Sequence, residues 1–215
     1  VPPAEIEEVL RGSAAAHKVA DVEVAGFLSG GVDSAYLTAL ARPARTYTIS
    51  YAEPKYDESF PARALARSLG VRNRVRRISP GEFWDAVPAV QYHMDEPLAD
   101  AAAGALYFLN REAAREVKVC LSGEGADELF GGYPWYHREE ILFEDTFPWS
   151  RSVGLRLGLL TPDAVRNGEE FVRQHYRDTC DRAPKLSSDD KKAARMREMF
   201  VLNLDWFMAT LLDRK

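Results

Sequence analysis

The sequence predicts an α/β fold, a doubly wound and mostly parallel sheet followed by a helical C-terminal part. Three observations carry this prediction: strand-like and helix-like segments alternate as far as residue 121, glycine-rich loops follow two of the strand-like segments, and no strand pattern appears from Tyr133 onward. Parallel strands need crossover connections, usually helical, which cover both faces of the sheet. We therefore expect an α/β core over residues 1–132 and a helical continuation over residues 133–215.

Each element of the core has its own local signal. Gly70 is expected to end a helix, because glycine readily adopts the left-handed conformation found at helix C-termini. Ser79, Pro80 and Glu82 form a helix start, with an N-cap serine, a proline at the first helical position and a glutamate three residues after the cap. Strands are expected over residues 22–28, 46–51, 74–78 and 117–121, and helices over residues 4–18, 57–69 and 101–116, besides the one that starts at Ser79.

The C-terminal part is expected to be helical. Thr161, Pro162 and Asp163 indicate a capped helix start. Methionine, aromatic and leucine side chains then recur at roughly helical spacing, which is more typical of core packing than of a cofactor site. These side chains are Met196, Met199, Phe200, Phe207 and Leu211.

Composition limits the classes of function. The chain has 215 residues, 46% of them hydrophobic, and a formal net charge of −5. Its length suits one domain, or one domain with an appendage, and its acidic balance argues against nucleic acid as a partner. The basic run over residues 72–77 is interpreted as a solvated strand edge. Without a bilayer-spanning segment or an export signal, the protein is predicted to be cytoplasmic and to have no membrane partner. Cys120 and Cys180 lack metal-site spacing and are expected to be reduced thiols.

The first glycine loop joins an apolar strand to a helix-prone segment. Its residues 29–34 are Ser-Gly-Gly-Val-Asp-Ser. The adjacent Gly30 and Gly31 let successive backbone N–H groups converge on an anion at the start of a helix. Because the loop lacks the Gly-Lys-Ser/Thr ending of the common nucleoside triphosphatases, it predicts a different way of binding phosphate. Ser29 and Ser34 are suited to donate hydroxyl hydrogen bonds to phosphate oxygens.

Asp33 is the unusual residue of this loop. A carboxylate there would repel a polyphosphate unless a cation lay between them, so Asp33 is a candidate Mg²⁺ ligand. The alternative is an aspartate that only caps the helix and interacts favourably with its dipole.

A second glycine loop follows the expected fourth strand. Residues 121–133 contain four glycines and three carboxylates. In an open α/β sheet, ligands bind beyond the carboxyl ends of the strands where the strand order reverses, and we expect the first and fourth strands to lie side by side there. Both loops would then face one ligand, and Asp33 and Asp127 would jointly hold Mg²⁺ with phosphate oxygens. The alternative for residues 122–127 is a purely structural turn.

Together with residues 95–100 (Asp-Glu-Pro-Leu-Ala-Asp), these two motifs resemble those of the ATP-pyrophosphatase superfamily, and within it the synthetase domain of the asparagine synthetase family. The resemblance covers nearly the whole chain, and the second motif is the more selective one. It implies an adenine nucleotide α-hydrolase-like fold and an amide-forming ligase of amino-acid biosynthesis. In the implied reaction, the side-chain carboxylate of the substrate aspartate attacks ATP at the α-phosphorus and releases pyrophosphate. Ammonia then converts the adenylate to asparagine and AMP. The aspartate carboxylate is already ionised at pH 7, so the first step needs alignment and charge neutralisation but no base.

The resemblance also implies roles for individual residues. Glu124 and Asp127 are the expected catalytic carboxylates, Glu124 acting on the adenylate and orienting or deprotonating the amine. Asp33 and Asp127 are the expected metal ligands. Contacts to ATP and pyrophosphate are expected from Leu28, Ser29, Gly30, Gly31, Asp33, Ser34, Ile49, Ser122 and Gly123, with backbone groups of Leu28 and Ile49 at the adenosine end.

Other polar residues are weaker candidates. Asp95, Glu96 and Asp100 are weak candidates for the amino-acid pocket. Residues 57–59 (Asp-Glu-Ser) either contact a phosphate-bound metal or cap a helix, and both readings stay open. His93 is interpreted as a hydrogen-bonded histidine in preference to an acid–base catalyst.

The chain departs from the family pattern at both ends. It has no cysteine before Cys120, so we expect no glutaminase domain of the family type in it, and ammonia would come from solution or from a glutaminase domain or chain. Its last residues resemble the start of a longer family segment, so a fragment of a larger polypeptide is expected. Three alternatives remain: a β-lactam-synthetase-like or other carboxylate-adenylating relative, a nucleotide-binding module without turnover, and a tRNA-modifying cousin, which the acidic composition disfavours.

Overall fold

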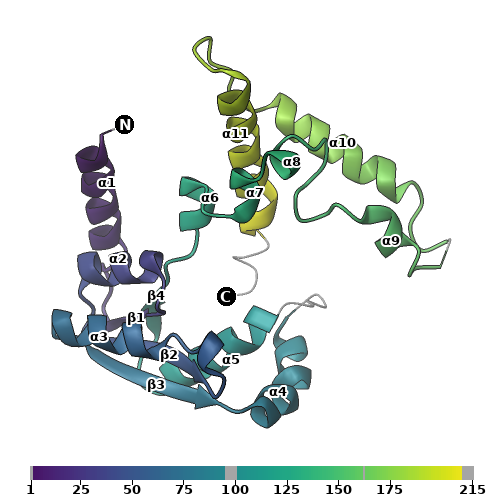
Figure 1. The fold of residues 1–215 in the computed structure, drawn as a ribbon. Helices are drawn as coiled ribbons and strands as arrows, with labels where there is room; N and C mark the ends of the chain where they lie inside the picture. Colours follow the sequence, from purple (N-terminus) through teal and green to yellow (C-terminus); the bar gives the residue numbers. More distant parts are fainter. Residues whose placement is uncertain (1, 95–100, 162, 210–215) are drawn as a thin grey trace. The chain divides into compact units, whose positions relative to one another are not determined.

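The computed structural model describes residues 2–94, 101–161 and 163–209 (Figure 1). Within this part the chain divides after Glu124 into two compact units, which are described separately. The predicted domain boundary after residue 132 stays a prediction.

The first unit contains a parallel sheet of four strands in the order β3-β2-β1-β4. β1 lies between β2, which it pairs through Gly26 with Thr46, and β4, which it pairs through Gly26 with Leu121. The chain therefore passes from β1 outward to β3 and returns to β4 on the other side of β1. This confirms the predicted adjacency of the first and fourth strands and puts the reversal of strand order between them. The strands are β1 (Val24–Phe27), β2 (Arg45–Tyr51), β3 (Arg72–Ile78) and β4 (Val119–Leu121).

Helices cover both faces of this sheet, as predicted for a doubly wound fold. On one face, Ala14 and Ala41 of two helices pack with Val24 and Leu121. On the other face, Tyr47 packs against the C-terminal half of a later helix. The helices of this unit are α1 (Pro3–Ala16), α2 (Val32–Ala41), α3 (Ser59–Leu69), α4 (Pro80–His93) and α5 (Ala101–Ala113), with a single 3₁₀ turn η1 (Pro54–Tyr56).

The local helix signals of this unit are borne out. Ser79 and Glu82 form a complete capping box at the start of α4. Gly70 ends α3 with a φ of +71°, in the left-handed region that favours glycine. Several predicted boundaries are too long: the helix expected to reach residue 116 ends at Ala113, and β4 has only three residues.

The basic run over residues 72–77 forms the edge strand β3, as predicted. Alternate residues of a strand point to opposite faces, so its arginines divide into two sets. On the α5 face, Arg74 forms ion pairs with Glu112 and Glu116, and Arg76 pairs with Glu82. Arg77 lies on the other face.

The second unit is helical in its described part. Its core contains Leu142, Met199 and Leu202, all with no exposed surface, and Met196 and Phe200 pack against this core, as the predicted apolar stripe requires. Phe207 makes edge-to-face contacts with Tyr133 and Trp135, and Leu211 lies outside the described residues. The elements are α6 (Ala126–Phe130), α7 (Pro134–His137), α8 (Glu139–Leu142), α9 (Val153–Leu157), α10 (Gly168–Asp181), α11 (Lys191–Leu202) and the π-helical turn η2 (Asn203–Phe207).

The helix start predicted at Thr161–Asp163 is wrong. The helix begins at Gly168 instead, after Asn167 in the left-handed conformation. A Cβ atom on Gly168 would lie 2.7 Å from a methyl carbon of Leu157 and 2.9 Å from one of Val165. Because Asn167 has a left-handed backbone, the right-handed helix begins only after it, and residue 168 packs closely on Leu157 and Val165.

Neither cysteine is in a disulfide, and no helix in the described residues is long and apolar enough to span a membrane. Burial raises the pKa of the Cys120 thiol to about 11. This thiol, within β4, is therefore protonated at neutral pH.

Candidate functional site

The candidate site begins where β1 ends. Leu28 is buried, its backbone N–H donates to the carbonyl oxygen of Tyr47 at 2.9 Å, and its own carbonyl oxygen accepts from the Thr48 hydroxyl at 2.6 Å. The strand end is thereby fixed to β2. The chain then turns through an exposed loop and enters α2, with Gly31 as the N-cap residue.

Two serine hydroxyls close this loop upon itself. Ser34 Oγ accepts from the Ser29 backbone N–H at 3.0 Å and lies 2.9 Å from Ser29 Oγ. The Gly31 N–H donates to Ser29 Oγ at 3.0 Å. Backbone N–H groups expected to bind phosphate are thus held by hydroxyl oxygens, which a phosphate oxygen can replace as acceptor.

A carboxylate occupies the third N–H group of the loop. The backbone N–H of Gly30 donates to Glu58 Oε2 at 3.0 Å. The fit is close, because a Cβ atom on Gly30 would lie 2.8 Å from Pro61 Cγ and 3.0 Å from Glu58 Cβ. The loop amide that an anionic ligand would use therefore already binds an anionic group of this chain.

This contact separates the roles of residues 57–59, which the sequence left open. Asp57 accepts from the Ser59 backbone N–H at 3.1 Å and so caps the first turn of α3. Glu58 makes no capping hydrogen bond with its side chain. The Glu58 side chain instead bonds the loop over residues 29–34, which is called the phosphate loop from here on.

The second glycine loop touches the first through Gly123. A Cβ atom at this position would lie 2.9 Å from the backbone nitrogen of Ser34 and 3.1 Å from the carbonyl carbon of Asp33. Only glycine fits here without displacement, because the atoms it approaches are main chain. The chain leaving β4 is thus packed directly on the first turn of α2 at Gly123. That Ser122 and Gly123 contact the same ligand as the first loop stays a prediction.

Asp33 lies in the first turn of α2, and its side chain is exposed. The N-cap position belongs to Gly31, so the alternative reading of Asp33 as the helix cap is not what the structure shows. An exposed carboxylate beside a set of backbone N–H groups suits a cation shared with phosphate oxygens.

Residues 125–133 of the second motif belong to the second unit, and their glycines have conformations or close contacts that other residues would not fit. Gly125 and Gly131, which flank α6, have φ values of +94° and +69°. A Cβ atom on Gly132 would lie only 1.9 Å from Asp127 Oδ1, so glycine leaves room for that carboxylate. Glu128 is buried and accepts a hydrogen bond from the Tyr133 hydroxyl. Of the motif's three carboxylates, Glu128 is therefore a structural one.

Not every predicted site residue is placed by the structure. Glu124, exposed, is the last residue of the first unit, and Asp127 lies in the second, so their joint action with Asp33 stays a prediction. The substrate-pocket candidates Asp95, Glu96 and Asp100 lie outside the described residues.

Ile49 lies in β2, two residues beyond the last residue paired with β1, and its contact with a nucleotide stays a prediction. Backbone groups of a strand alternate between its two neighbours, so those of Ile49 face the same side as those of Tyr47, which bonds the end of β1. Ile49 lies two residues beyond Tyr47, and β1 has ended there. For Leu28, both backbone groups already have partners, so only the second lone pair of its carbonyl oxygen remains for a ligand.

The residues present fit both ATP and Mg²⁺. The loop offers N–H groups bonded to hydroxyl and carboxylate oxygens, which are the acceptors most like phosphate. Mg²⁺ prefers one or two carboxylates together with phosphate oxygens and water, a need that Asp33 and Asp127 match in chemistry. Within the described residues, no group of three or more histidine, cysteine, aspartate or glutamate side chains is placed to hold a metal ion.

Comparison with known protein families shows to which family the chain belongs. The family model named Asparagine synthase matches residues 5–215. The chain belongs to the asparagine synthase family. Asparagine synthetase [glutamine-hydrolyzing] 3 of Bacillus subtilis is 34% identical over 236 residues, covering 99% of this chain and 38% of that protein. Asparagine synthetase [glutamine-hydrolyzing] 1 of the same organism is 36% identical over 168 residues, covering 75% of this chain.

This member of the asparagine synthase family spans only 27% to 38% of the length of these two relatives. Among solved structures, an NMN synthetase from Francisella tularensis is similar with a TM-score of 0.47 and 15% identity, over 97% of this chain and 96% of that one.

Sequence reasoning missed the Glu58 contact and the Thr48 hydroxyl on Leu28. For Thr48 a signal existed, since Thr46, Thr48 and Ser50 alternate along β2 and so place three hydroxyls on one face. For Glu58 no local pattern indicates which partner its carboxylate chooses.

We expect Gly123→Ala to destabilise the chain by about 1–3 kcal/mol, because the added methyl group overlaps the backbone of α2. Urea denaturation measures the change. Gly12→Ala is the control, since nothing lies within 4 Å of its added Cβ in α1, and it should be neutral or stabilising. Equal stability of the Gly123→Ala variant and the native chain would contradict the packing of the two loops.

We expect Glu58→Gln to bind inorganic pyrophosphate about tenfold more tightly, because a charged acceptor no longer competes for the Gly30 N–H. Isothermal titration calorimetry measures the affinity. Glu53→Gln makes the same charge change at the N-cap of η1, where the side chain makes no capping hydrogen bond, and should leave the affinity unchanged. Weaker binding by Glu58→Gln would show that Glu58 assists the anion, as a metal ligand would.

Proposed function

We propose that this chain is the ATP-dependent, amide-forming part of an asparagine synthetase, which adenylates a side-chain carboxylate and releases pyrophosphate. One observation carries the proposal: Gly123 packs on the backbone of Ser34, so the loop after β4 adjoins the phosphate loop at the reversal of strand order. Membership of the asparagine synthase family supports the choice of reaction.

In the proposed first step, a carboxylate oxygen of aspartate attacks the α-phosphorus of ATP. A carbon-bound oxygen gains a bond to the α-phosphorus, the bond from that phosphorus to the bridging oxygen breaks, and pyrophosphate leaves with the electron pair. Residues 29–34 receive the pyrophosphate: their N–H groups exchange hydroxyl and carboxylate oxygens of the chain for phosphate oxygens. Such a step depends on positioning and charge neutralisation.

In the proposed second step, the nitrogen of ammonia attacks the acyl carbon of the adenylate. The carbon–oxygen bond to phosphate breaks, AMP leaves, and the nitrogen loses one proton to give the amide. Glu124 is proposed to orient the amine or to accept that proton, work of a kind worth about 10²–10⁴-fold in rate. Its exposed position directly after the loop that adjoins Ser34 supports this role.

Mg²⁺ bound by Asp33, with Asp127 as the second carboxylate, would supply positive charge between the phosphates and the acidic residues. Asp33 stands in the first turn of α2, next to the loop N–H groups. Asp127 is accommodated by the absence of a side chain at Gly132.

The adenosine end is proposed to rest on backbone groups of Leu28 and Ile49, with Ser122 and Gly123 enclosing the nucleotide. The relatives are named as glutamine-hydrolysing, so the ammonia is proposed to come from a glutaminase domain or chain, or from solution. We place this activity in the cytoplasm.

Exchange of labelled pyrophosphate into ATP tests the proposal. Exchange that requires aspartate is expected, and other carboxylates such as glutamate and succinate should not support it. Exchange with a different carboxylate would instead indicate an adenylating relative, such as a β-lactam-forming one. Binding of ATP without any exchange would overturn the catalytic proposal and leave a nucleotide-binding module.

Asp33→Ala is expected to abolish magnesium-dependent ATP binding, because no other group of the loop carries a negative charge for the cation. Calorimetry with and without Mg²⁺ measures this binding. Asp21→Ala removes an exposed carboxylate before β1 and serves as the control. Unchanged binding by Asp33→Ala would refute the metal assignment.

A further inference from the structure

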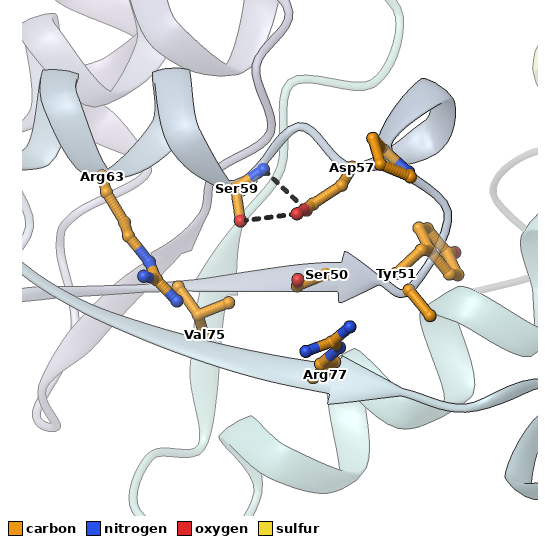
Figure 2. A pocket seen from close by; sticks show the side chains of 9 residues that line it. Ser50, Tyr51, Asp57, Ser59, Arg63, Val75 and Arg77 are labelled. Carbon is orange, nitrogen blue, oxygen red and sulfur yellow. Dashed lines mark hydrogen bonds between the residues drawn. The ribbon is translucent and has the colours of Figure 1, made fainter.

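A pocket outside the phosphate loop opens between α3 and the carboxyl ends of β2 and β3 (Figure 2). Its volume is about 400 Å³. No residue of the loop over residues 29–34 lines it. The polar and charged residues that do are Ser50, Tyr51, Asp57, Ser59, Arg63 and Arg77, and Val75 of β3 lines it too.

Two arginines from different elements line this pocket. Figure 2 shows Arg63 extending from α3 and Arg77 from the end of β3, with both guanidinium groups over the strands. Within the described residues, neither guanidinium has an ion pair or a hydrogen bond. The neighbouring arginines of β3 differ, since Arg74 and Arg76 are both paired with glutamates on the opposite face.

The carboxylate that lines the pocket, that of Asp57, already accepts hydrogen bonds from this chain. Asp57 accepts from the Ser59 N–H at 3.1 Å and from the Ser59 hydroxyl at 3.2 Å. Burial acts to raise the pKa of Asp57, but the hydrogen bonds from Ser59, and then from Ser50, outweigh it and hold the pKa below its ordinary value. Asp57 is therefore ionised at neutral pH, and its oxygens accept hydrogen bonds from Ser59 at the start of α3 and from Ser50 of β2.

The pocket thus has two cations and one anion. Guanidinium groups bind phosphate and carboxylate through pairs of parallel N–H bonds, and two of them on one cavity suit a single anionic group. We propose that this pocket is a second anion-binding site, which takes the phosphate or carboxylate group of a small molecule through Arg63 and Arg77. The pocket and the loop over residues 29–34 share no lining residue.

Titration followed by NMR tests the proposal on the 215-residue chain. The probes are inorganic phosphate and succinate, and the signals are the side-chain Nε–H groups of Arg63 and Arg77. Saturable shifts of both signals are expected with at least one probe. Tighter binding of phosphate would identify a phosphoryl group as the ligand, and tighter binding of succinate a carboxylate. Absence of a saturable shift with either probe would overturn the proposal.

Variants separate this pocket from the phosphate loop. Arg63→Gln and Arg77→Gln are each expected to weaken the binding about tenfold, since each removes a charge-assisted contact. Arg67→Gln, an exposed arginine of α3 that does not line the pocket, should leave it unchanged. Asp33→Ala should also leave it unchanged, so a failure of the proposed ATP chemistry does not affect this test. Affinity that is equal in the native chain and both pocket variants would contradict the site.

Discussion

The packing of Gly123 against the first turn of α2 is the constraint on which the candidate site depends. It follows from the strand order, because only with β4 beside β1 can the chain leaving β4 reach the helix that follows β1. A side chain at residue 123 would meet main-chain atoms at 2.9 Å. The absence of a single Cβ atom thus lets two loops, about ninety residues apart in sequence, come into contact.

The first glycine loop is held by hydrogen bonds to this chain's own hydroxyl and carboxylate groups. Three successive backbone N–H groups, those of Ser29, Gly30 and Gly31, are bonded to hydroxyl or carboxylate oxygens. These internal acceptors fix the conformation of the exposed loop. In the proposed function, a phosphate would replace each of them with an equivalent or stronger acceptor, so the number of hydrogen bonds would be nearly unchanged and charge would set the affinity.

Much of this architecture could be predicted because its signals are local. The capping box at Ser79 and Glu82 and the glycine stop at Gly70 depend only on residues within one helical turn, and the adjacency of β1 and β4 follows from a general rule of open sheets. The predicted helix start at Thr161 was wrong because the backbone is left-handed at Asn167, so the helix begins at Gly168. The contact of Glu58 with Gly30 joins residues 28 positions apart and depends on how α3 approaches the loop. Pairing choices of this kind, like the lack of an ion pair for Arg63 and Arg77 within the described residues, arise only in the folded chain.

The central claim is that one ligand engages both glycine loops at once. Amide hydrogen exchange followed by mass spectrometry, with and without ATP and Mg²⁺, tests it most directly. The account predicts that peptides covering residues 28–34 and residues 121–124 become protected together and with the same dependence on nucleotide concentration. Protection of the first segment alone, with exchange over residues 121–124 unchanged, would contradict it.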